Sequence, residues 1–364
     1  MNIYSIADNI ISPLGIDTIS NLDAISNGKS GITLINDRNL SETEFYAAKI
    51  KYDLPLLEGY SFLESLFIQS IKATISDLDL DNERTVLVLS STKGNIDLLE
   101  DEGNSRVLLP KMAEAINGYF SLKKSPILIS NACISGVSAI LVARNLISMR
   151  KADNVIVSGG DVLSKFTLSG FNCLKAVSDA PCKPYDEKRT GISLGEGVGT
   201  ILLSNNINLN KNKSALSEIV GGGQSNDANH ISGPSRTGAG LNLAVKKAMI
   251  EAKLNSDKID YINSHGTATL FNDEMESIAF ADLNLGQVEL NSLKGYFGHT
   301  LGAAGIIESI LAIHQMNNGL LYKSLGFDIK GVSRDINVLS NNKSKPIRNA
   351  LKTVSGFGGC NAAV

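Results

Sequence analysis

The sequence predicts an α/β protein of layered architecture, and two patterns lead to that prediction. Short runs rich in β-branched residues recur along the chain and are separated by longer stretches with helical periodicity. The runs are apolar without strict alternation of apolar and polar residues, which is typical of strands that helices cover on both faces. We therefore expect mostly parallel sheet between layers of helices.

The elements follow one another in a regular order. A first strand is expected within residues 1–15, and further strands at 85–91, 126–130, 154–160, 199–204, 259–264 and 288–293. Helices are expected at 61–78, 110–121, 133–149, 238–253, 272–283 and 303–317. The polar, Asn- and Lys-rich segment 204–214 divides the chain into an N-terminal half, 1–205, and a C-terminal half, 206–364. No short-period repeat is visible, and the two halves are too dissimilar to show a duplication by eye.

Composition excludes several classes of protein. Hydrophobic residues make up 43% of the 364 residues, which is enough for a large core, and the net charge of −3 argues against nucleic acid as the main partner. The N-terminus lacks the basic region of a signal peptide, and the most apolar interior stretch, 136–143, is far shorter than the roughly 20 residues that span a bilayer. The four cysteines form no CxxC pair, so we expect a reduced, cytoplasmic protein without a metal site.

Cys133 lies where an apolar strand ends and a helix begins, in the segment PILISNACISGVSAILVARNLI. A thiol at a helix N-terminus faces unpaired N–H groups and the positive end of the helix dipole, which favour the thiolate and attack on a thioester. The alternative is a buried structural cysteine, since free cysteines are commonly buried.

Two histidines follow predicted strands in a similar way. His265 lies in YINSHGTATLFNDEMES, with Asp273 and Glu276 at helical spacing behind it, and His299 lies in LKGYFGHTLGAAG, five residues after Lys294. The carboxyl ends of strands are where α/β folds place ligands. The alternative for each histidine is a core or capping role. Because no HExxH is present, metal ligation is a weak competitor.

Two glycine-rich segments remain, at 184–199 and 354–364. The first does not fit GxGxxG and precedes a strand rather than a helix, so a dinucleotide site is not expected there. The second contains GFGG, whose backbone N–H groups could stabilise a developing oxyanion, or which could be only a tight turn.

Taken together, these segments resemble the β-ketoacyl-acyl carrier protein synthases of the elongating, Cys-His-His type, which belong to the thiolase superfamily. The matching segments, in chain order, are IISPLG, NACISG, ADNVIVSGG, PYDEKRTGISLGEGVG, SHGTAT followed by ND, LKGYFGHTLGAAG and GFGGCNAAV. The resemblance spans nearly the whole chain. It implies a thiolase-like fold of two similar halves in an α-β-α-β-α arrangement.

The resemblance also implies a role for each of these residues. Cys133 would accept an acyl chain from the phosphopantetheine of an acyl carrier protein, and His265 and His299 would bind the malonyl thioester and stabilise the enolate left by loss of carbon dioxide. Backbone N–H groups of Cys133 and Phe357 would form an oxyanion hole. The remaining assignments are support of the histidines by Lys294, Glu276 and Asp273, and contact with pantetheine by Thr267 and Thr269. The family needs no cofactor of its own and works as a homodimer or as a heterodimer with a second ketosynthase-like subunit.

The chain departs from the family in ways that bear on its substrate. It is shorter than its relatives before Cys133, and its helix at 61–73 lacks a basic cluster for the carrier protein. The basic residues expected to replace that cluster are Arg106, Lys111, Arg150 and Lys151. Lys93 and Ser355 replace apolar residues at the acyl pocket, so we expect short or stiff, polyunsaturated acyl chains. Alternatively, Lys93 points away from the pocket and pairs with Asp97 or Glu100.

Two other functions remain open from the sequence. A chain-length-factor-like partner subunit would usually lack the nucleophile, and Cys133 is retained. A thiolase acting on coenzyme A thioesters would need a second reactive cysteine near the C-terminus, for which Cys360 is the candidate.

Overall fold

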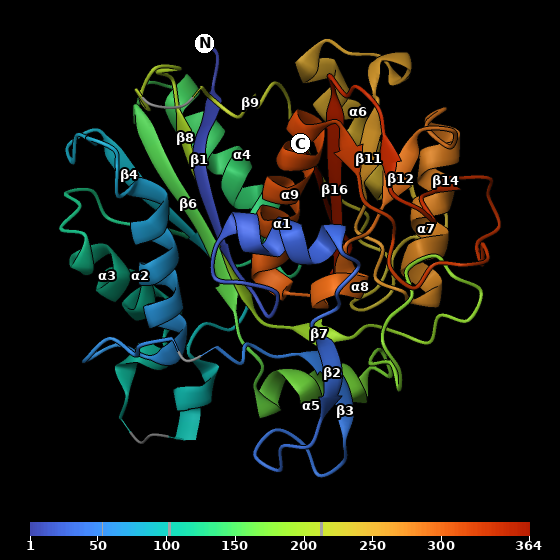
Figure 1. Cartoon of the computed structure of the whole chain (residues 1–364), viewed down its shortest axis with the longest axis horizontal. Coiled ribbons are helices and arrows are strands. Elements are labelled where there is room, and N and C mark those ends of the chain that lie inside the picture. The colour runs from blue at the N-terminus through green and yellow to red at the C-terminus, as the bar shows by residue number, and fades with distance from the viewer. Residues whose placement is uncertain (53, 101–102, 212–213) are drawn as a thin grey trace.

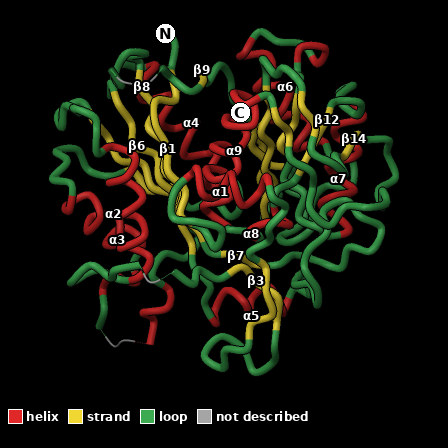
Figure 2. The backbone as a smooth tube through the Cα atoms, in the orientation of Figure 1, coloured by secondary structure: helices red, strands yellow, loops and turns green. Residues whose placement is uncertain are grey.

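The computed structural model of the protein has five layers (Figures 1 and 2). Two six-stranded sheets form two of them, and helices lie between the sheets and on their outer faces. The structure describes residues 1–52, 54–100, 103–211 and 214–364. The layered α-β-α-β-α architecture predicted from the sequence is confirmed. The expectation of mostly parallel sheet is wrong, because antiparallel pairs are as common as parallel ones in the two large sheets. Residues 212 and 213 of the polar segment at 204–214 lie outside the described residues.

The first sheet is built mainly from the N-terminal part of the chain. Its strands, in spatial order, are β5 (Ile127–Ile129), β4 (Thr85–Ser90), β6 (Asn154–Asp161), β8 (Gly197–Ser204), β1 (Tyr4–Ile11) and β9 (Ser217–Glu218). β4, β5 and β6 are parallel to one another, and β8 and β1 run antiparallel to their neighbours. β9 lies beyond residue 206, so the chain adds one more strand to this sheet before it enters the second.

The second sheet belongs to the C-terminal part of the chain. Its strands, in spatial order, are β10 (Gly223–Asn226), β17 (Cys360–Ala363), β16 (Ala350–Gly356), β11 (Tyr261–Asn263), β12 (Glu289–Asn291) and β14 (Asn337–Val338). β12, β11 and β16 are parallel, and β17 and β10 are antiparallel to their neighbours.

The two sheets repeat one topology. The spatial order β5-β4-β6-β8-β1 in the first corresponds strand for strand to β12-β11-β16-β17-β10 in the second, with the same directions. The two halves are therefore similar in fold although their sequences hide it.

Helices fill the three remaining layers (Figure 1). The outer face of the first sheet carries α2 (Phe62–Ile75) and α3 (Leu109–Tyr119), and that of the second carries α6 (Ala239–Ala252) and α7 (Leu270–Asp282). α4 (Ser135–Ser148) and α9 (Ala304–Asn318) lie between the sheets. Their aliphatic side chains, among them Ile140, Ile147, Ile306 and Ile310, form one buried core with the first sheet.

The two central helices touch through glycine. A Cβ atom on Gly136 of α4 would lie 2.8 Å from the backbone nitrogen of Ile306, and one on Gly305 of α9 would lie 2.5 Å from that of Val137. Neither distance is compatible with a side chain, so the backbones pack directly against each other at this point.

Local sequence explains where the long helices begin. α2 starts with a capping box, because the Ser61 hydroxyl accepts from the backbone of Glu64 at 3.1 Å and the Glu64 carboxylate accepts from the backbone of Ser61 at 2.9 Å.

The six residues of β4 are all buried, as expected for a strand covered on both faces.

Several elements were not predicted. They are α1 (Thr18–Ser26), α5 (Lys165–Cys173), α8 (Lys294–Phe297), β2 (Ile32–Ile35), β3 (Phe45–Ala48), β7 (Leu194–Gly195), β13 (Leu320–Leu321), β15 (Lys343–Ser344), and the 3₁₀ helices η1 (Ile96–Glu100), η2 (Ser105–Val107), η3 (Ser256–Lys258) and η4 (Leu301–Ala303). Within the two large sheets, β9, β10, β14, β16 and β17 were not predicted either. β2, β3 and β7 form a small separate sheet. The glycine-rich C-terminal segment is also more than a turn, because β16 and β17 flank it as a hairpin in the second sheet.

Candidate active site

Cys133 lies in a sharp turn between β5 and α4. Ala132 has a φ of 45°, which is rare for a residue with a side chain, and helix α4 starts two residues after the cysteine. The Ser135 hydroxyl accepts from the backbone N–H of Asn131 at 2.7 Å and donates to the carbonyl of Ala132 at 2.6 Å, which closes the turn. The predicted strand–turn–helix context of this cysteine is confirmed.

The sequence-based expectation of a thiolate does not hold for the resting site. Burial raises the pKa of the Cys133 thiol to about 11, because it outweighs the opposing effects of the Lys294 charge and of a hydrogen bond from the Phe357 backbone. The thiol is therefore neutral at pH 7. Neighbouring groups must therefore stabilise the negative charge that develops on the sulfur when it loses its proton.

His299 is the nearest such group. Its Nε2 atom lies 3.0 Å from the Cys133 sulfur, and its Nδ1 atom accepts from the backbone N–H of Leu301 at 3.3 Å. Because Nδ1 is an acceptor, the hydrogen of the neutral ring is assigned to Nε2, which then points at the sulfur. Burial holds the pKa of His299 well below its usual range, so the ring is neutral.

His265 has the same arrangement with a different partner. The Lys294 ammonium lies 3.2 Å from Nδ1 of His265, and since an ammonium can only donate, Nδ1 accepts and Nε2 carries the hydrogen. The two imidazole rings meet edge to face with centroids 5.1 Å apart. Burial, with a further effect of the Lys294 charge, keeps the pKa of His265 well below its usual range. Two neutral Nε2–H donors thus flank one buried thiol.

Lys294 is held by three acceptors. Its ammonium bonds to the His265 carbonyl at 2.6 Å and to the Glu308 carboxylate at 2.6 Å, in addition to Nδ1 of His265. All three of its N–H donors are used, so its position is fixed. Glu308 was missed by the sequence analysis, although a glutamate within the apolar stretch AGIIESILAI could have drawn attention to it.

Glu276 and Asp273 support the backbone around His265 rather than its ring. The Glu276 carboxylate accepts from the backbone of His265 at 2.8 Å and of Gly266 at 2.7 Å, and Asp273 accepts from the backbone of Thr267 at 2.9 Å and of Tyr185 at 2.7 Å. Burial raises the pKa of both carboxyls, that of Asp273 to about 7 with a further contribution from the Glu276 charge.

We expect Asp273→Asn to lower the free energy of unfolding by about 1–3 kcal/mol, because the amide has one oxygen for two buried backbone donors. Urea unfolding at neutral pH measures this change. The matched control is Asp282→Asn, which alters an exposed aspartate on the same helix and should change stability little. An unchanged midpoint for Asp273→Asn would contradict the assigned support role.

A cavity of about 380 Å³ opens beside the cysteine. Its wall includes the three reactive side chains, Thr267 and Thr269, whose hydroxyls share a hydrogen bond of 2.8 Å, and the GFGG loop with Phe357. The Phe357 ring stacks on Phe171 with centroids 5.4 Å apart. The thiol therefore lies at the wall of a cavity large enough for part of an elongated thioester.

Lys93 is not among the residues that line this cavity, whereas Ser355 is. The Lys93 ammonium lies 3.4 Å from the carbonyl oxygen of Thr92, and its backbone N–H donates to the buried Asp161 carboxylate at 3.2 Å. Its charge still lowers the pKa of Cys133, so it lies within electrostatic reach of the sulfur. Of its two possible acidic partners, the side chain of Glu100 lies outside the described residues.

Fold and site together define a class: an acyl-transferring enzyme of thiolase-like fold. Residues 73–206 match the family described as Beta-ketoacyl synthase, N-terminal domain, and residues 216–328 match Beta-ketoacyl synthase, C-terminal domain. The chain belongs to the β-ketoacyl synthase family.

Individual relatives agree with this assignment. The chain is 30% identical to Nodulation protein E of Rhizobium leguminosarum bv. trifolii over 73% of this chain and 69% of that protein. It is 29% identical to 3-oxoacyl-[acyl-carrier-protein] synthase 2 of Vibrio harveyi over 98% of this chain and 95% of that protein.

Solved structures agree as well. A ketosynthase from Xenorhabdus doucetiae, solved in complex with its chain length factor, is 25% identical with a TM-score of 0.87 and covers 100% of this chain and 96% of its own. A beta-ketoacyl synthase from Burkholderia phymatum has a TM-score of 0.89 at 23% identity, with 100% and 98% covered, and shares the fold. Among the described residues, no helix is both long and apolar enough to cross a membrane.

Proposed function

We propose that the chain catalyses a decarboxylative Claisen condensation between an acyl group carried on Cys133 and a malonyl group carried on an acyl carrier protein. Such a reaction extends a fatty-acid, polyketide or polyene chain by two carbons. The observation that carries the proposal is the convergence of two neutral Nε2–H donors, from His265 and His299, on the cavity beside the thiol.

In the first step, the Cys133 sulfur attacks the carbonyl carbon of an acyl thioester. The bond from that carbon to the carrier sulfur breaks, and the carrier leaves as a free thiol with the proton from Cys133. The His299 Nε2–H, 3.0 Å from the sulfur, stabilises the charge that forms on it. Backbone N–H groups of Cys133 and Phe357 would stabilise the tetrahedral oxyanion.

In the second step, malonyl loses carbon dioxide. The electron pair of the broken C–C bond moves onto the thioester carbonyl and gives an enolate, whose oxygen would accept from Nε2–H of His265 and His299. The enolate carbon then attacks the acyl group on Cys133 and breaks its C–S bond. The released sulfur takes up a proton, because the pKa of the buried thiol is about 11.

We infer that this chemistry needs no metal ion. Cys133, His265 and His299 have the donor atoms to hold one, since these atoms lie within 4.8 Å of one another. Two buried lysines, Lys294 and Lys352, place positive charge beside the imidazoles, however, and that charge disfavours a divalent cation.

The expected partner is an acyl carrier protein, whose pantetheine would pass Thr267 and Thr269. Of the basic residues suggested by the sequence, Arg106 is engaged by Glu64 at 3.4 Å and by the Tyr60 ring, and Arg150 and Lys151 follow the end of α4 that is remote from Cys133. Lys175 is exposed and lines the cavity, and we propose it as a carrier contact.

We also propose that the chain works in the cytoplasm as a homodimer or with a second ketosynthase-like subunit. The four cysteines are free, which fits a reducing compartment. Ketosynthases solved with a chain length factor, from Xenorhabdus doucetiae and from ishigamide synthesis, provide examples of the paired arrangement.

Neither alternative function has a comparable supporting observation. A chain-length-factor-like role gives no reason for a buried thiol between two imidazole donors. For a thiolase, Cys360 would have to reach the substrate, but its sulfur bonds to Asn131 at 3.1 Å and it does not line the cavity.

The test of the proposed function is intact-mass analysis after incubation with acyl carrier proteins bearing different acyl groups, followed by malonyl carrier protein. We expect an acyl adduct on the chain and then its transfer to the carrier as a β-ketoacyl thioester. An adduct that forms from coenzyme A thioesters alone would favour the thiolase alternative.

We expect the wild type to prefer short or conjugated acyl chains over saturated chains of palmitoyl length. Lys93 does not line the cavity, so the prediction concerns acyl chains long enough to extend beyond it toward the ammonium, where burial against an alkyl chain costs several kcal/mol unless the lysine is paired or neutralised. Competition assays with matched saturated and conjugated substrates on wild type and Lys93→Ile test this, and the variant should gain use of the saturated chain. Equal use of palmitoyl and short acyl groups by the wild type, unchanged in Lys93→Ile, would show that Lys93 does not determine which acyl chain is accepted.

A further inference from the structure

A second buried lysine shares the carboxylate that holds Lys294. Lys352 lies on β16 with 3% of its surface exposed, and its ammonium bonds to the Glu308 oxygen that Lys294 leaves free and to the Ser264 carbonyl at 3.2 Å. Glu308 is thus placed between two ammonium groups. The three bonded groups, Lys294, Lys352 and Glu308, sum to a charge of +1 behind His265. The next acid is Glu276 at the His265 backbone, and burial raises the pKa of its carboxyl.

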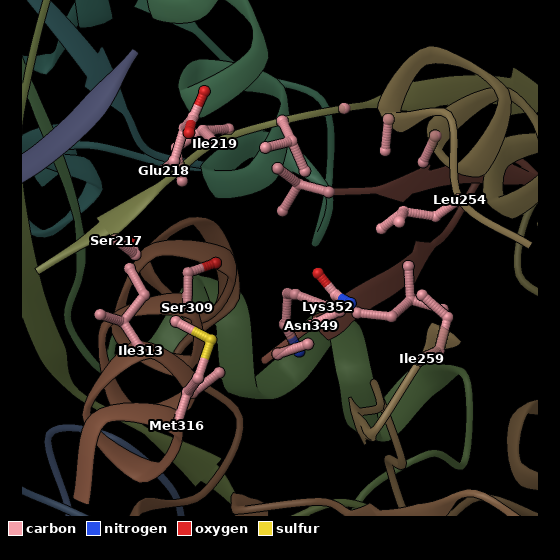
Figure 3. Close-up of a pocket in the computed structure, with 18 of the residues that line it drawn as sticks. Ser217, Glu218, Ile219, Leu254, Ile259, Ser309, Ile313, Met316, Asn349 and Lys352 are labelled. Carbon is pink, nitrogen blue, oxygen red and sulfur yellow. The ribbon is translucent and has the colours of Figure 1, made fainter. Parts of the chain in front are cut away.

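Lys352 also lies at a second cavity. This cavity, of about 290 Å³, is lined from both halves of the chain, by residues of α9 and β16 among others (Figure 3). Lys352, Ser309 and Asn349 are labelled on its wall. Lys352 therefore contacts both Glu308 and the cavity, whereas Lys294 and Glu308 do not line it.

We propose that Lys352 is a positioning residue for the condensation, one that supplies the surplus positive charge behind His265 and keeps both catalytic imidazoles in their neutral, Nε2–H form. This inference rests on the proposed function. A single lysine on Glu308 would form a neutral ion pair, whose field at the enolate is weaker than that of an uncompensated cation. The added cation stabilises negative charge on the enolate oxygen without contacting substrate.

The electrostatics of the site agree with this role. The Lys352 charge lowers the pKa of both His265 and His299. Burial and Lys294 have larger effects on both rings, and His299 also has a larger effect on His265. Burial lowers the pKa of Lys352 itself to about 8, against the opposing effect of Glu308. The other charged groups around Lys352 are Lys294 from α8 and Glu276 from α7, with Glu218 of β9 and Arg348 on the cavity wall.

The sign of the pH dependence follows from the lysine. Below pH 8 Lys352 is protonated, and the cluster of Lys294, Lys352 and Glu308 has its net positive charge. Above pH 8 it loses its proton, the cluster becomes neutral, and stabilisation of the enolate weakens. We therefore expect malonyl decarboxylation to fall as the pH rises through about 8.

The experiment compares Lys352→Met and Lys352→Arg with wild type, measuring decarboxylation of malonyl carrier protein over a pH range that brackets 8. Lys352→Met removes the charge and should lower kcat on the order of tenfold at neutral pH, with little change in KM and without the alkaline decline. Lys352→Arg keeps a charge that does not titrate, and the adjoining cavity has room for the longer side chain. It should retain activity and extend it above pH 8.

Lys345→Met is the matched control. Lys345 lies seven residues before Lys352 and also pairs with a glutamate, at 2.9 Å, but this partner is Glu289 rather than Glu308. Its pH profile should equal that of wild type. If Lys352→Met does not fold, the pH profile of decarboxylation by Lys352→Arg still tests the proposal.

An alkaline decline unchanged in Lys352→Arg would overturn the proposal, as would a folded Lys352→Met with wild-type kcat. Failure of the proposed function is distinct, since wild type itself would then not decarboxylate malonyl carrier protein.

Discussion

Cys133→Ala should abolish covalent acyl transfer to the chain while leaving the fold intact. Cys133 is the cysteine with two imidazoles beside it and a cavity in front of it, and its sulfur is the atom that forms the thioester. The side chain packs in a turn closed by Ser135, which does not depend on the sulfur. Intact-mass analysis should show no adduct, and circular dichroism should match wild type.

The control for this variant is Cys173→Ala, which removes an exposed cysteine of α5 and should load acyl groups normally. Acylation that persists in Cys133→Ala, or is lost in Cys173→Ala, would refute the assignment.

His265→Ala should reduce malonyl decarboxylation by about 10²–10³-fold, the usual effect of removing one oxyanion donor, while acylation of Cys133 continues. The reason for the separation is geometric. His265 donates toward the cavity, whereas His299 lies 3.0 Å from the sulfur, so His299→Ala should slow both decarboxylation and acylation.

Single-turnover assays measure the two steps separately, with acyl carrier protein for loading and malonyl carrier protein for release of carbon dioxide. His314→Ala serves as a control, because His314 pairs with Asp8 at 2.8 Å, and it should change neither step. A His265→Ala variant that cannot load acyl groups but decarboxylates at the wild-type rate would reverse the roles assigned to this residue.

The sequence predicted the strands and helices that are long and apolar, and those predictions are confirmed. The missed elements lack that signal. β16, with the sequence ALKTVSG, has Lys352, Thr353 and Ser355 at buried positions, and only their tertiary partners make a strand of it. The similarity of the two halves, expected from the family resemblance, is confirmed by their strand order. It is not visible in the sequence itself, because strand order and direction are properties of pairing and leave no periodic trace.

The site was predictable in its reactive groups but less so in its charges. Cys133 follows β5 of the first sheet and His265 follows β11 of the second, so the ends of strands located each of them in the sequence. Their meeting depends on how the two sheets are layered, which a strand pattern does not show. The protonation state of the Cys133 thiol could not be predicted from the sequence. The sequence shows that the cysteine lies at a helix N-terminus, but it does not show how deeply the thiol is buried, and burial has the largest effect on its pKa. Glu308 and Lys352 escaped notice because a buried ion cluster is recognised only when its members, distant in sequence, come together.

The direct contact of α4 with α9 at Gly136 and Gly305 has a consequence for how this protein can evolve. Cys133 stands three residues before one of these glycines and His299 six residues before the other, and the two come from different halves of the chain. Neither half alone supplies both the nucleophile and a histidine donor. A mutation that adds even a methyl group at this crossing must push the two helices apart. Substitution of either glycine is therefore expected to alter the spacing between sulfur and imidazole, although neither glycine contacts the substrate.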